Sequence, residues 1–200
     1  MNSTLREGVA QVGENRAATI ERWLAREREA RVLLAQPGRI APEEIGRSSG
    51  LEFLKRIARG ELPSAPIFQA LDFVPVECDA GRMVFQGTPK SEYYNPIGSV
   101  HGGYIATLLD SALACAIQTM LAQGFGYTTL ELKLSYLRPL TDRTGPVRAE
   151  GWVIDLSGQV GTAEGRLIDV DGTLYAHATA TCLITALPEP SVSGRGAPIG

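Results

Sequence analysis

Cysteine and histidine are scarce in this chain of 200 residues, which holds three cysteines and two histidines. Cys78, Cys115 and Cys182 are odd in number and far apart, so we expect reduced thiols rather than a disulfide framework. The sequence has no CxxC motif, and His101 and His177 alone would not hold a structural zinc ion. We therefore expect no metal or redox cofactor.

The chain also lacks an excess of positive charge. Its formal net charge of −3 and its pI near 5.5 argue against a nucleic-acid partner. We expect no secretory signal at the N-terminus, because residues 1–16 carry charges where a signal peptide needs an uninterrupted apolar run. We expect a cytoplasmic protein.

The longest mostly apolar stretch runs from Asn95 to Leu121. Apolar residues recur at three- and four-residue intervals between Ile105 and Met120, which predicts a helix covered on most sides by other structure. The stretch contains Asp110 and Gln118 and has no close flanking Lys or Arg, so we do not expect it to span a membrane. Two glycines mark the expected end of the helix, Gly124 and Gly126.

The start of this helix carries a spaced set of polar residues. Asn95 is followed six residues later by His101, Gly102 and Gly103, and Asp110 stands nine residues after the histidine. The glycines leave backbone N–H groups uncovered where the helix begins, so these groups can face a ligand oxygen. The pattern resembles the acyl-CoA thioesterases of the hotdog fold, specifically the phenylacetate-degradation (PaaI-like) type, over about residues 50–185.

Segments with strand-like alternation surround the helix. Phe73–Val76 and Met83–Phe85 predict two strands joined at Asp79–Gly81, and Pro75 indicates an edge position or a bulge. Further strands are predicted over Leu130–Leu137, Val147–Leu156, Val160–Val170 and Leu174–Thr185. One long helix among antiparallel strands is typical of an α+β fold. The resemblance implies the hotdog fold, an antiparallel sheet wrapped around one central helix.

The N-terminal part has a different pattern. Residues 3–35 combine alternating Arg and Glu with apolar residues at helical spacing, which predicts one or two amphipathic helices weakened at Gly8 and Gly13. These helices either pack on their own domain or a neighbouring subunit, or form an arm that binds a partner. Short helices are predicted from Pro42, Ser49 and Ile67. We divide the chain into an N-terminal helical extension (1–62), a hotdog thioesterase domain (63–187) and a disordered tail (188–200).

Hydrolysis of a thioester needs a polarised carbonyl and a carboxylate, or a water that it activates, to attack the carbon. The N–H of Gly102 or Gly103 can polarise the carbonyl, and Asp110 is the expected nucleophile or general base. The eight residues from Gly102 to Asp110 separate their backbones by about 12 Å along one helix, whereas reacting groups must approach to about 3.5 Å. We therefore expect a site shared by two subunits, in a homodimer or a homotetramer.

The resemblance implies three more site residues. Asn95 matches an asparagine that orients the site, and His101 matches the histidine before the polarising glycine. Thr129 matches a hydroxyl residue that orients the nucleophile or water, with Thr128 as its rival. On residue chemistry alone, Asn95 is a turn residue and His101 a structural hydrogen-bonding group. The acyl group is expected in an apolar pocket between subunits, shaped by Tyr104, Ala106 and Ala112.

The expected partner is an acyl-CoA. Lys90, Arg138 and Arg143 are candidates for contacts with the CoA phosphates, and ordinary surface charge is the alternative for each. Two other functions stay open. One is a hotdog protein that binds acyl-CoA without hydrolysing it and uses the N-terminal helices as its output. The other is a hydratase, whose paired Asp and His motif we do not find; Asp110 favours the thioesterase.

Overall fold

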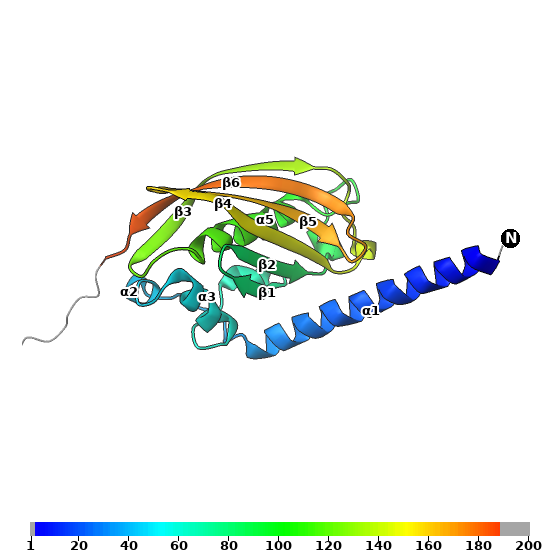
Figure 1. The fold of residues 1–200 in the computed structure, drawn as a ribbon, viewed down its shortest axis with the longest axis horizontal. Coiled ribbons are helices and arrows are strands. Elements are labelled where there is room, and N and C mark those ends of the chain that lie inside the picture. The colour runs from blue at the N-terminus through cyan, green and yellow to red at the C-terminus, as the bar shows by residue number, and fades with distance from the viewer. Residues whose placement is uncertain (1–2, 189–200) are drawn as a thin grey trace, which may run out of the picture.

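The computed structural model describes the backbone of residues 3–188 and the side chains of residues 16–188. Its centre is helix α5 (Gly102–Gln118), and a six-stranded antiparallel sheet curls around this helix (Figure 1). The strands lie in the order β1-β2-β4-β5-β6-β3 across the sheet. This arrangement confirms the expected α+β plan. The strands are β1 (Phe73–Asp79), β2 (Arg82–Gly87), β3 (Phe125–Tyr136), β4 (Val147–Ser157), β5 (Val160–Asp169) and β6 (Leu174–Ala186).

Helix α5 is seated closely on the sheet because a glycine of β4 presents no side chain to it. A Cβ atom at Gly151 would lie 2.5 Å from the carbonyl oxygen of Ala112. The apolar side chains of α5 that face the sheet are fully buried, among them Leu108, Leu109 and Leu113. This packing fixes the depth of the helix, and with it the positions of the polar residues that the helix carries.

The end of α5 differs from the prediction. The helix stops at Gln118, and the Oγ1 of Thr119, its C-cap, accepts a hydrogen bond from the N–H of Gly81 at 2.7 Å. The expectation that Gly124 and Gly126 end the helix is wrong. Gly124 turns the chain with a φ of 84°, and Gly126 already belongs to β3.

Strand β3 is an edge strand and begins at Phe125, ahead of its predicted start at Leu130. Within the described chain it pairs with β6 on one side only. The predicted half-buried alternation holds for Leu132 and Leu134. It fails at Leu130, which is 61% exposed, because the register shifts after Thr129.

Strand β1 forms the opposite edge of the sheet. Its register with β2 shifts between Pro75 and Glu77, so Pro75 lies on an edge strand and beside an irregularity, as predicted. Both faces of β1 are covered. On the inner face the ring of Phe73 packs on Phe68 with centroids 5.1 Å apart, and on the outer face Val74 packs against the N-terminal helix.

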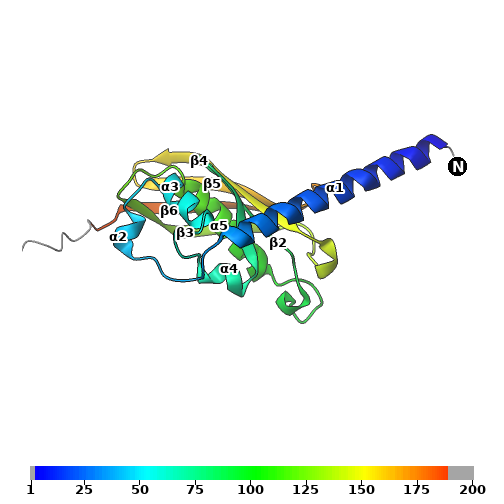
Figure 2. The ribbon, with the colours of Figure 1, turned by 90° about the horizontal axis from the view of Figure 1, so that it is seen from below.

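Four helices precede the sheet in the part of the chain that is described: α1 (Ser3–Leu33), α2 (Pro42–Ile45), α3 (Gly50–Ala58) and α4 (Pro66–Ala70). Helix α1 runs without a break through Gly8 and Gly13. Its C-terminal half lies against β1 and β2, while its N-terminal half extends away from the sheet (Figures 1 and 2). The predicted apolar stripe before residue 16 lies outside the described side chains, and the predicted tail, from residue 189 on, lies outside the described residues.

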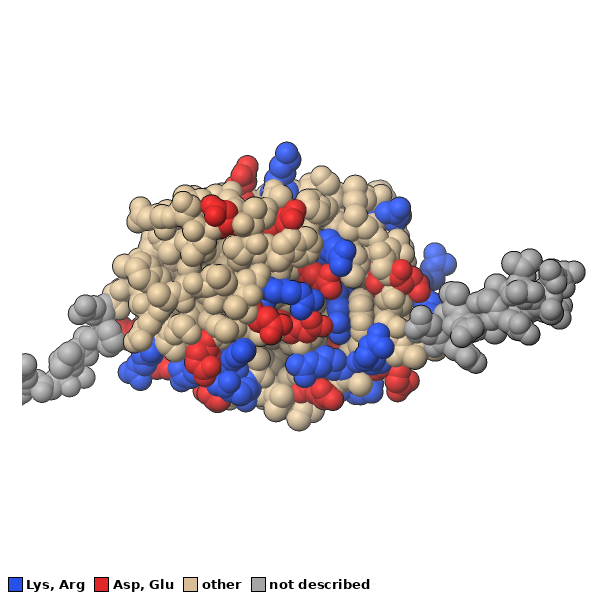
Figure 3. Space-filling model, in the orientation of Figure 1, with Lys and Arg blue, Asp and Glu red and all other residues tan. Residues whose placement is uncertain are grey.

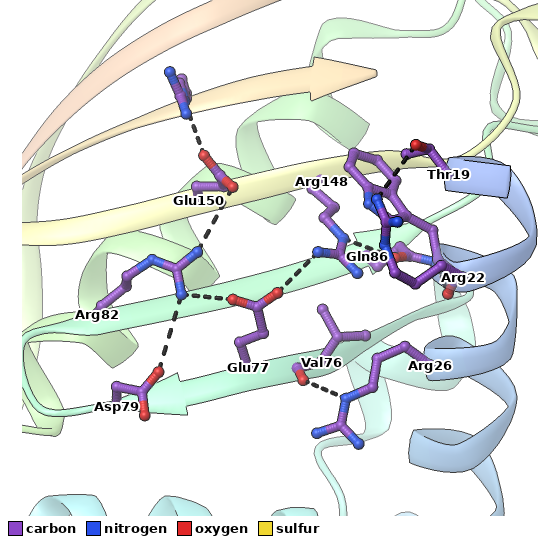
Figure 4. A network of polar contacts seen from close by, with 12 residues as sticks. Thr19, Arg22, Arg26, Val76, Glu77, Asp79, Arg82, Gln86, Arg148 and Glu150 are labelled. Carbon is purple, nitrogen blue, oxygen red and sulfur yellow. Dashed lines mark hydrogen bonds and ion pairs between the residues drawn. The ribbon is translucent and has the colours of Figure 1, made fainter. Parts of the chain in front are cut away.

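A buried polar network fastens α1 to the sheet. The side-chain amide of Gln86 donates to the carbonyl oxygen of Trp23 at 2.9 Å and to Glu27 at 2.8 Å. Arg148 donates to Gln86 at 2.9 Å and to Glu77 at 2.8 Å (Figure 4), and its guanidinium lies 4.2 Å from the centroid of the Trp23 ring. These buried groups are all paired, as stable packing requires. The C-terminal half of α1 therefore packs on its own domain.

The surface of the molecule is unevenly charged. Charged side chains gather over the lower part and the middle of the face in Figure 3, and only a few acidic ones lie over its upper left. None of the helices described is both long enough and apolar enough to cross a membrane. Among the described residues, no group of three or more His, Cys, Asp and Glu is placed to hold a metal ion.

Candidate active site

Helix α5 begins at the glycine pair with one N–H group unengaged. His101 is the N-cap, and its Nδ1 accepts a hydrogen bond from the N–H of Gly103 at 2.8 Å. The N–H of Gly102 donates to no acceptor in the described part of the chain. Gly102 is also the first residue of α5, and the helix dipole favours negative charge at this end of the helix. Of the two glycines, Gly102 is therefore the one whose N–H is available to a carbonyl oxygen.

A cavity of about 440 Å³ opens beside Gly102. Tyr136 and Arg138, from the end of β3 and the segment after it, line this cavity. The hydroxyl of Tyr136 donates to the carbonyl oxygen of Gly102 at 3.1 Å, and a Cβ atom at Gly102 would lie 2.8 Å from that hydroxyl. Strand β3 thus holds the first turn of α5 in place, and a glycine is what permits so close an approach.

Asn95 lines the same cavity, but its side chain is engaged in its own turn. Its Oδ1 accepts hydrogen bonds from the N–H groups of Ile97 at 3.0 Å and Ser99 at 3.4 Å, and its Nδ2 donates to the Ser99 hydroxyl at 3.0 Å. This is the pattern of an Asx turn. The structure places Asn95 near Gly102 and shows its role in shaping the loop, while a role toward the substrate carbonyl stays a prediction.

Asp110 lies in a second and larger cavity, of about 670 Å³. The residue is half-buried, and its Oδ1 has no hydrogen-bond partner among the described residues. Sheltering a carboxylate from water without a partner is costly, and stable folds normally avoid it. Only Oδ1 is fully buried, and no hydrogen bond to Oδ2 is found in the described structure, so Oδ2 is the oxygen that a substrate or a water molecule in the cavity can reach.

Gly102 and Asp110 face different cavities of the same chain. One continuous helix joins them, so their backbones are about 12 Å apart. The structure thus brings Asn95 together with Gly102, and Thr129 together with Asp110. It does not bring these two groups together within one chain.

The two threonines before Leu130 both line the larger cavity, but they point differently. Thr129 accepts a hydrogen bond from the thiol of Cys182 at 3.9 Å, and the Tyr127 hydroxyl contacts the sulfur of Cys115 at 3.9 Å. Successive strand residues point to opposite faces, and Thr128, between these two, is exposed. The geometry favours Thr129 over Thr128 as the hydroxyl that faces α5, and its catalytic role stays a prediction.

Cys115 is a second nucleophilic group in the larger cavity, where the sequence indicated only a small core residue. Burial raises the pKa of the Cys115 thiol to about 12. The thiolate is the reactive form of cysteine, so Cys115 is essentially unreactive at neutral pH. Asp110 is the better candidate for the attacking group.

The wall of the larger cavity corrects a prediction about its lining residues. The described chain alone supplies this wall, and the expectation that the acyl pocket lies between subunits stays a prediction. Tyr104 and Ala112 were expected to shape it. Both are buried in the core instead, Tyr104 with its ring stacked 4.8 Å from that of Tyr93, and neither they nor Ala106 line the cavity. The wall opposite α5 comes from the N-terminal segments, through Ile40, Ile45, Phe53, Leu54, Ile57 and Phe68.

The basic residues expected near the CoA phosphates are distributed unevenly. Lys90 pairs with Asp72 at 2.6 Å, and Arg143 lines neither cavity. Arg138 lines the cavity beside Gly102, where it donates to the carbonyl oxygen of Leu174 at 2.6 Å. His177 lies on β6, 3.5 Å from Glu164, away from both cavities.

This chain is similar in sequence to known proteins. The family model of the thioesterase superfamily matches residues 97–176, a range that includes Gly102, Asp110 and Thr129. A protein of Saccharolobus solfataricus named "Putative esterase" is 32% identical over 112 residues, which are 56% of this chain and 78% of that protein.

Solved structures show the same fold. A phenylacetic acid degradation-related protein of Ralstonia eutropha is 33% identical, with a TM-score of 0.59 over 64% of this chain and 97% of that one. A variant of the phenylacetic acid degradation protein PaaI of Thermus thermophilus is 28% identical, with a TM-score of 0.53 over 59% of this chain and 97% of that one. This chain therefore belongs to the thioesterase superfamily, in its hotdog fold.

Proposed function

We propose that this protein is an acyl-CoA thioesterase that releases a free acid and CoA and works at least as a dimer. One observation carries the proposal: α5 carries two groups without a partner in the described structure, the N–H of Gly102 and the carboxylate of Asp110, and the two residues line different cavities. The first suits a carbonyl oxygen and the second suits the attack on its carbon. They are about 12 Å apart, so a second subunit has to complete each site.

The open edge of β3 supports association of two chains. Leu130, Tyr136 and Leu137 are 61%, 55% and 50% exposed on or just after this strand. An unpaired edge with exposed apolar side chains favours pairing with another strand. If two β3 edges pair across a twofold axis, the two α5 helices run antiparallel, and Asp110 of each subunit approaches Gly102 of the other.

The proposed reaction uses groups of the chain itself. The N–H of Gly102 donates to the thioester carbonyl oxygen, and the bond strengthens as that oxygen becomes negative. Asp110 of the partner subunit either attacks the carbonyl carbon directly or takes a proton from a water that attacks it. If a water attacks, the carbon–sulfur bond breaks and Asp110 returns the proton to the CoA sulfur. If Asp110 attacks, the broken bond leaves a mixed anhydride on Asp110 and a CoA thiolate, which takes a proton from solvent. A water then hydrolyses the anhydride, which releases the acid and frees Asp110. Arg138, beside Gly102, is the candidate for a contact with the CoA phosphates.

Two inactive variants, mixed together, test the shared site. Asp110→Asn removes the attacking group, and Gly102→Pro removes the N–H group. A mixed dimer still holds one complete site, with Gly102 from one chain and Asp110 from the other. If the variants are unfolded and refolded together in equal amounts, we expect thiol release from acyl-CoA at about a quarter of the wild-type rate, because half of the dimers are mixed.

The controls are each variant refolded alone, which should stay near background. A mixture that is no more active than its components would contradict a site shared between subunits. A fully active monomer, identified by sedimentation, would contradict it as well.

A further inference from the structure

The cavity beside Asp110 follows α5 toward its C-terminal end. The helix residues that line it are Asp110, Ser111, Ala114, Cys115 and Gln118. From Asp110 to Gln118 the helix rises by about 12 Å, at 1.5 Å per residue. The cavity is therefore long enough along the helix for an extended acyl chain whose thioester lies at Asp110.

The start of α3 lies against the C-terminal end of α5, next to this cavity. The N–H of Gly50 donates to the carbonyl oxygen of Leu121 at 2.9 Å, and a Cβ atom at Gly50 would lie only 1.7 Å from the carbonyl oxygen of Gln118. Such an approach of α3 to the end of α5 is possible only with glycine. Gln118 thus lies at the end of the cavity where α3 and α5 meet.

Two side chains that line the cavity carry buried polar atoms with no partner in the described structure. One is Asp110, through its Oδ1, and the other is Gln118, through its Nε2. Both atoms are closed off from the cavity, so a molecule there can reach only the other polar atom of each side chain, Asp110 Oδ2 and Gln118 Oε1. Gln118 is only 3% exposed. A buried amide without a hydrogen bond lowers stability, and natural folds seldom keep one without a reason. The Tyr127 hydroxyl and the Cys115 thiol, in contrast, contact each other.

We propose that Gln118 binds a hydroxyl group at the distal end of a medium-length acyl chain held in this cavity. The side-chain carbonyl oxygen of Gln118, Oε1, is not among the fully buried atoms and accepts no hydrogen bond in the described structure, so a hydroxyl in the cavity can donate to it. No Lys, Arg or His lines the cavity in the described structure, so nothing there would balance a distal carboxylate. The walls between the two ends are largely apolar and suit the methylene groups of the chain. The inference rests on the proposed thioesterase function.

The test compares two CoA thioethers that cannot be hydrolysed, one with an octyl chain and one with an ω-hydroxyoctyl chain. Calorimetry should show that the wild-type protein binds the hydroxylated compound at least about tenfold more tightly, because the plain methyl end leaves the amide unpaired. Gln118→Leu should abolish this preference and bind the octyl compound at least as well as the wild type does. Gln69→Leu, on the exposed surface of α4 and outside this cavity, is the matched control and should keep the preference.

Equal or weaker binding of the hydroxylated compound by the wild type would overturn the inference, because the amide would then be satisfied by retained water. An unchanged preference in Gln118→Leu would overturn it too. Hydrolysis is measured separately, on octanoyl-CoA and ω-hydroxyoctanoyl-CoA. Selective binding of the thioethers without hydrolysis of either ester would remove the proposed function and leave the binding role of Gln118 intact.

Discussion

The two ends of helix α5 offer opposite environments to a substrate. At the first turn, Gly102 has a free N–H group beside a cavity that also holds Asn95, Tyr136 and Arg138. From Asp110 onward the helix borders a larger cavity with largely apolar walls, contributed by the N-terminal segments. We propose that the first environment receives the thioester carbonyl oxygen and the CoA, and that the second receives the acyl chain. On this proposal one helix carries two complementary half-sites, and a second copy of the chain joins them.

The largest loss of activity is expected when the carboxylate of Asp110 is replaced by a neutral amide. Asp110→Asn should lower kcat for acyl-CoA hydrolysis by about a hundredfold to ten-thousandfold, the range for losing a catalytic base or nucleophile. Because the carboxylate has no partner for its Oδ1 in the described structure, the thermal unfolding temperature should stay the same or rise. Thiol release and thermal unfolding measure the two effects. A variant with wild-type kcat would show that Asp110 takes no part in the chemistry.

The N-terminal end of α5 can be tested with Gly102→Pro, which removes the backbone N–H group of residue 102. Gly102 is the first residue of the helix, a position that accepts proline, and His101 has the extended backbone that must precede it. Gly102→Pro should therefore lower kcat by about a hundredfold, as expected for one lost donor to the developing oxyanion.

Gly102→Ala is the matched control for the proline variant. It adds a Cβ atom near Tyr136 in the same way but keeps the N–H group. We expect it to retain most of the activity that the proline variant loses. Equal losses in the two variants would assign the effect to crowding against Tyr136 rather than to the missing donor.

The smallest expected effect is on the unfolding temperature at alkaline pH, through Cys115 in the C-terminal half of α5. Burial raises the pKa of the Cys115 thiol from about 9 to about 12, so the folded state binds this proton more tightly than the unfolded state. The stabilisation is fully present below about pH 9 and is lost as the pH rises toward 12. Cys115→Ala should reduce the fall of the unfolding temperature over this window by a few degrees. An unchanged alkaline profile would mean that the thiol is solvated in the cavity.

The fold was largely predictable because its signals are local. The apolar period of α5, the alternation in β4, β5 and β6 and the turn at Gly81 all follow from neighbouring residues. The end of α5 was misplaced because Thr119 caps it through a contact with Gly81, which is distant in sequence. The bulge after Thr129 and the exposure of Leu130 depend on pairing with β6, so they could not be predicted from neighbouring residues either.

The positions of the candidate site residues could be predicted from the sequence, whereas their surroundings could not, and their roles stay predictions. His101, Gly102 and Asp110 stand at spacings that resemble a thioester site, and the distance along one helix led to the prediction of a second subunit. The cavity wall was missed, because the apolar spacing of α3 does not say which surface that helix covers. Gln118 was noted only as a polar residue in an apolar run.

By itself, the sequence of this protein determined that α5 would carry a free N–H group and a carboxylate too far apart to act together, because helical rise depends only on residue number. Only the tertiary structure decided that Gly102, and not Gly103, keeps its N–H free, since His101 takes the other by folding back on it. It also decided that the N-terminal helices enclose the space beside Asp110, through the contact of Gly50 with the end of α5. Such contacts join residues that are remote along the chain, and no local pattern specifies them.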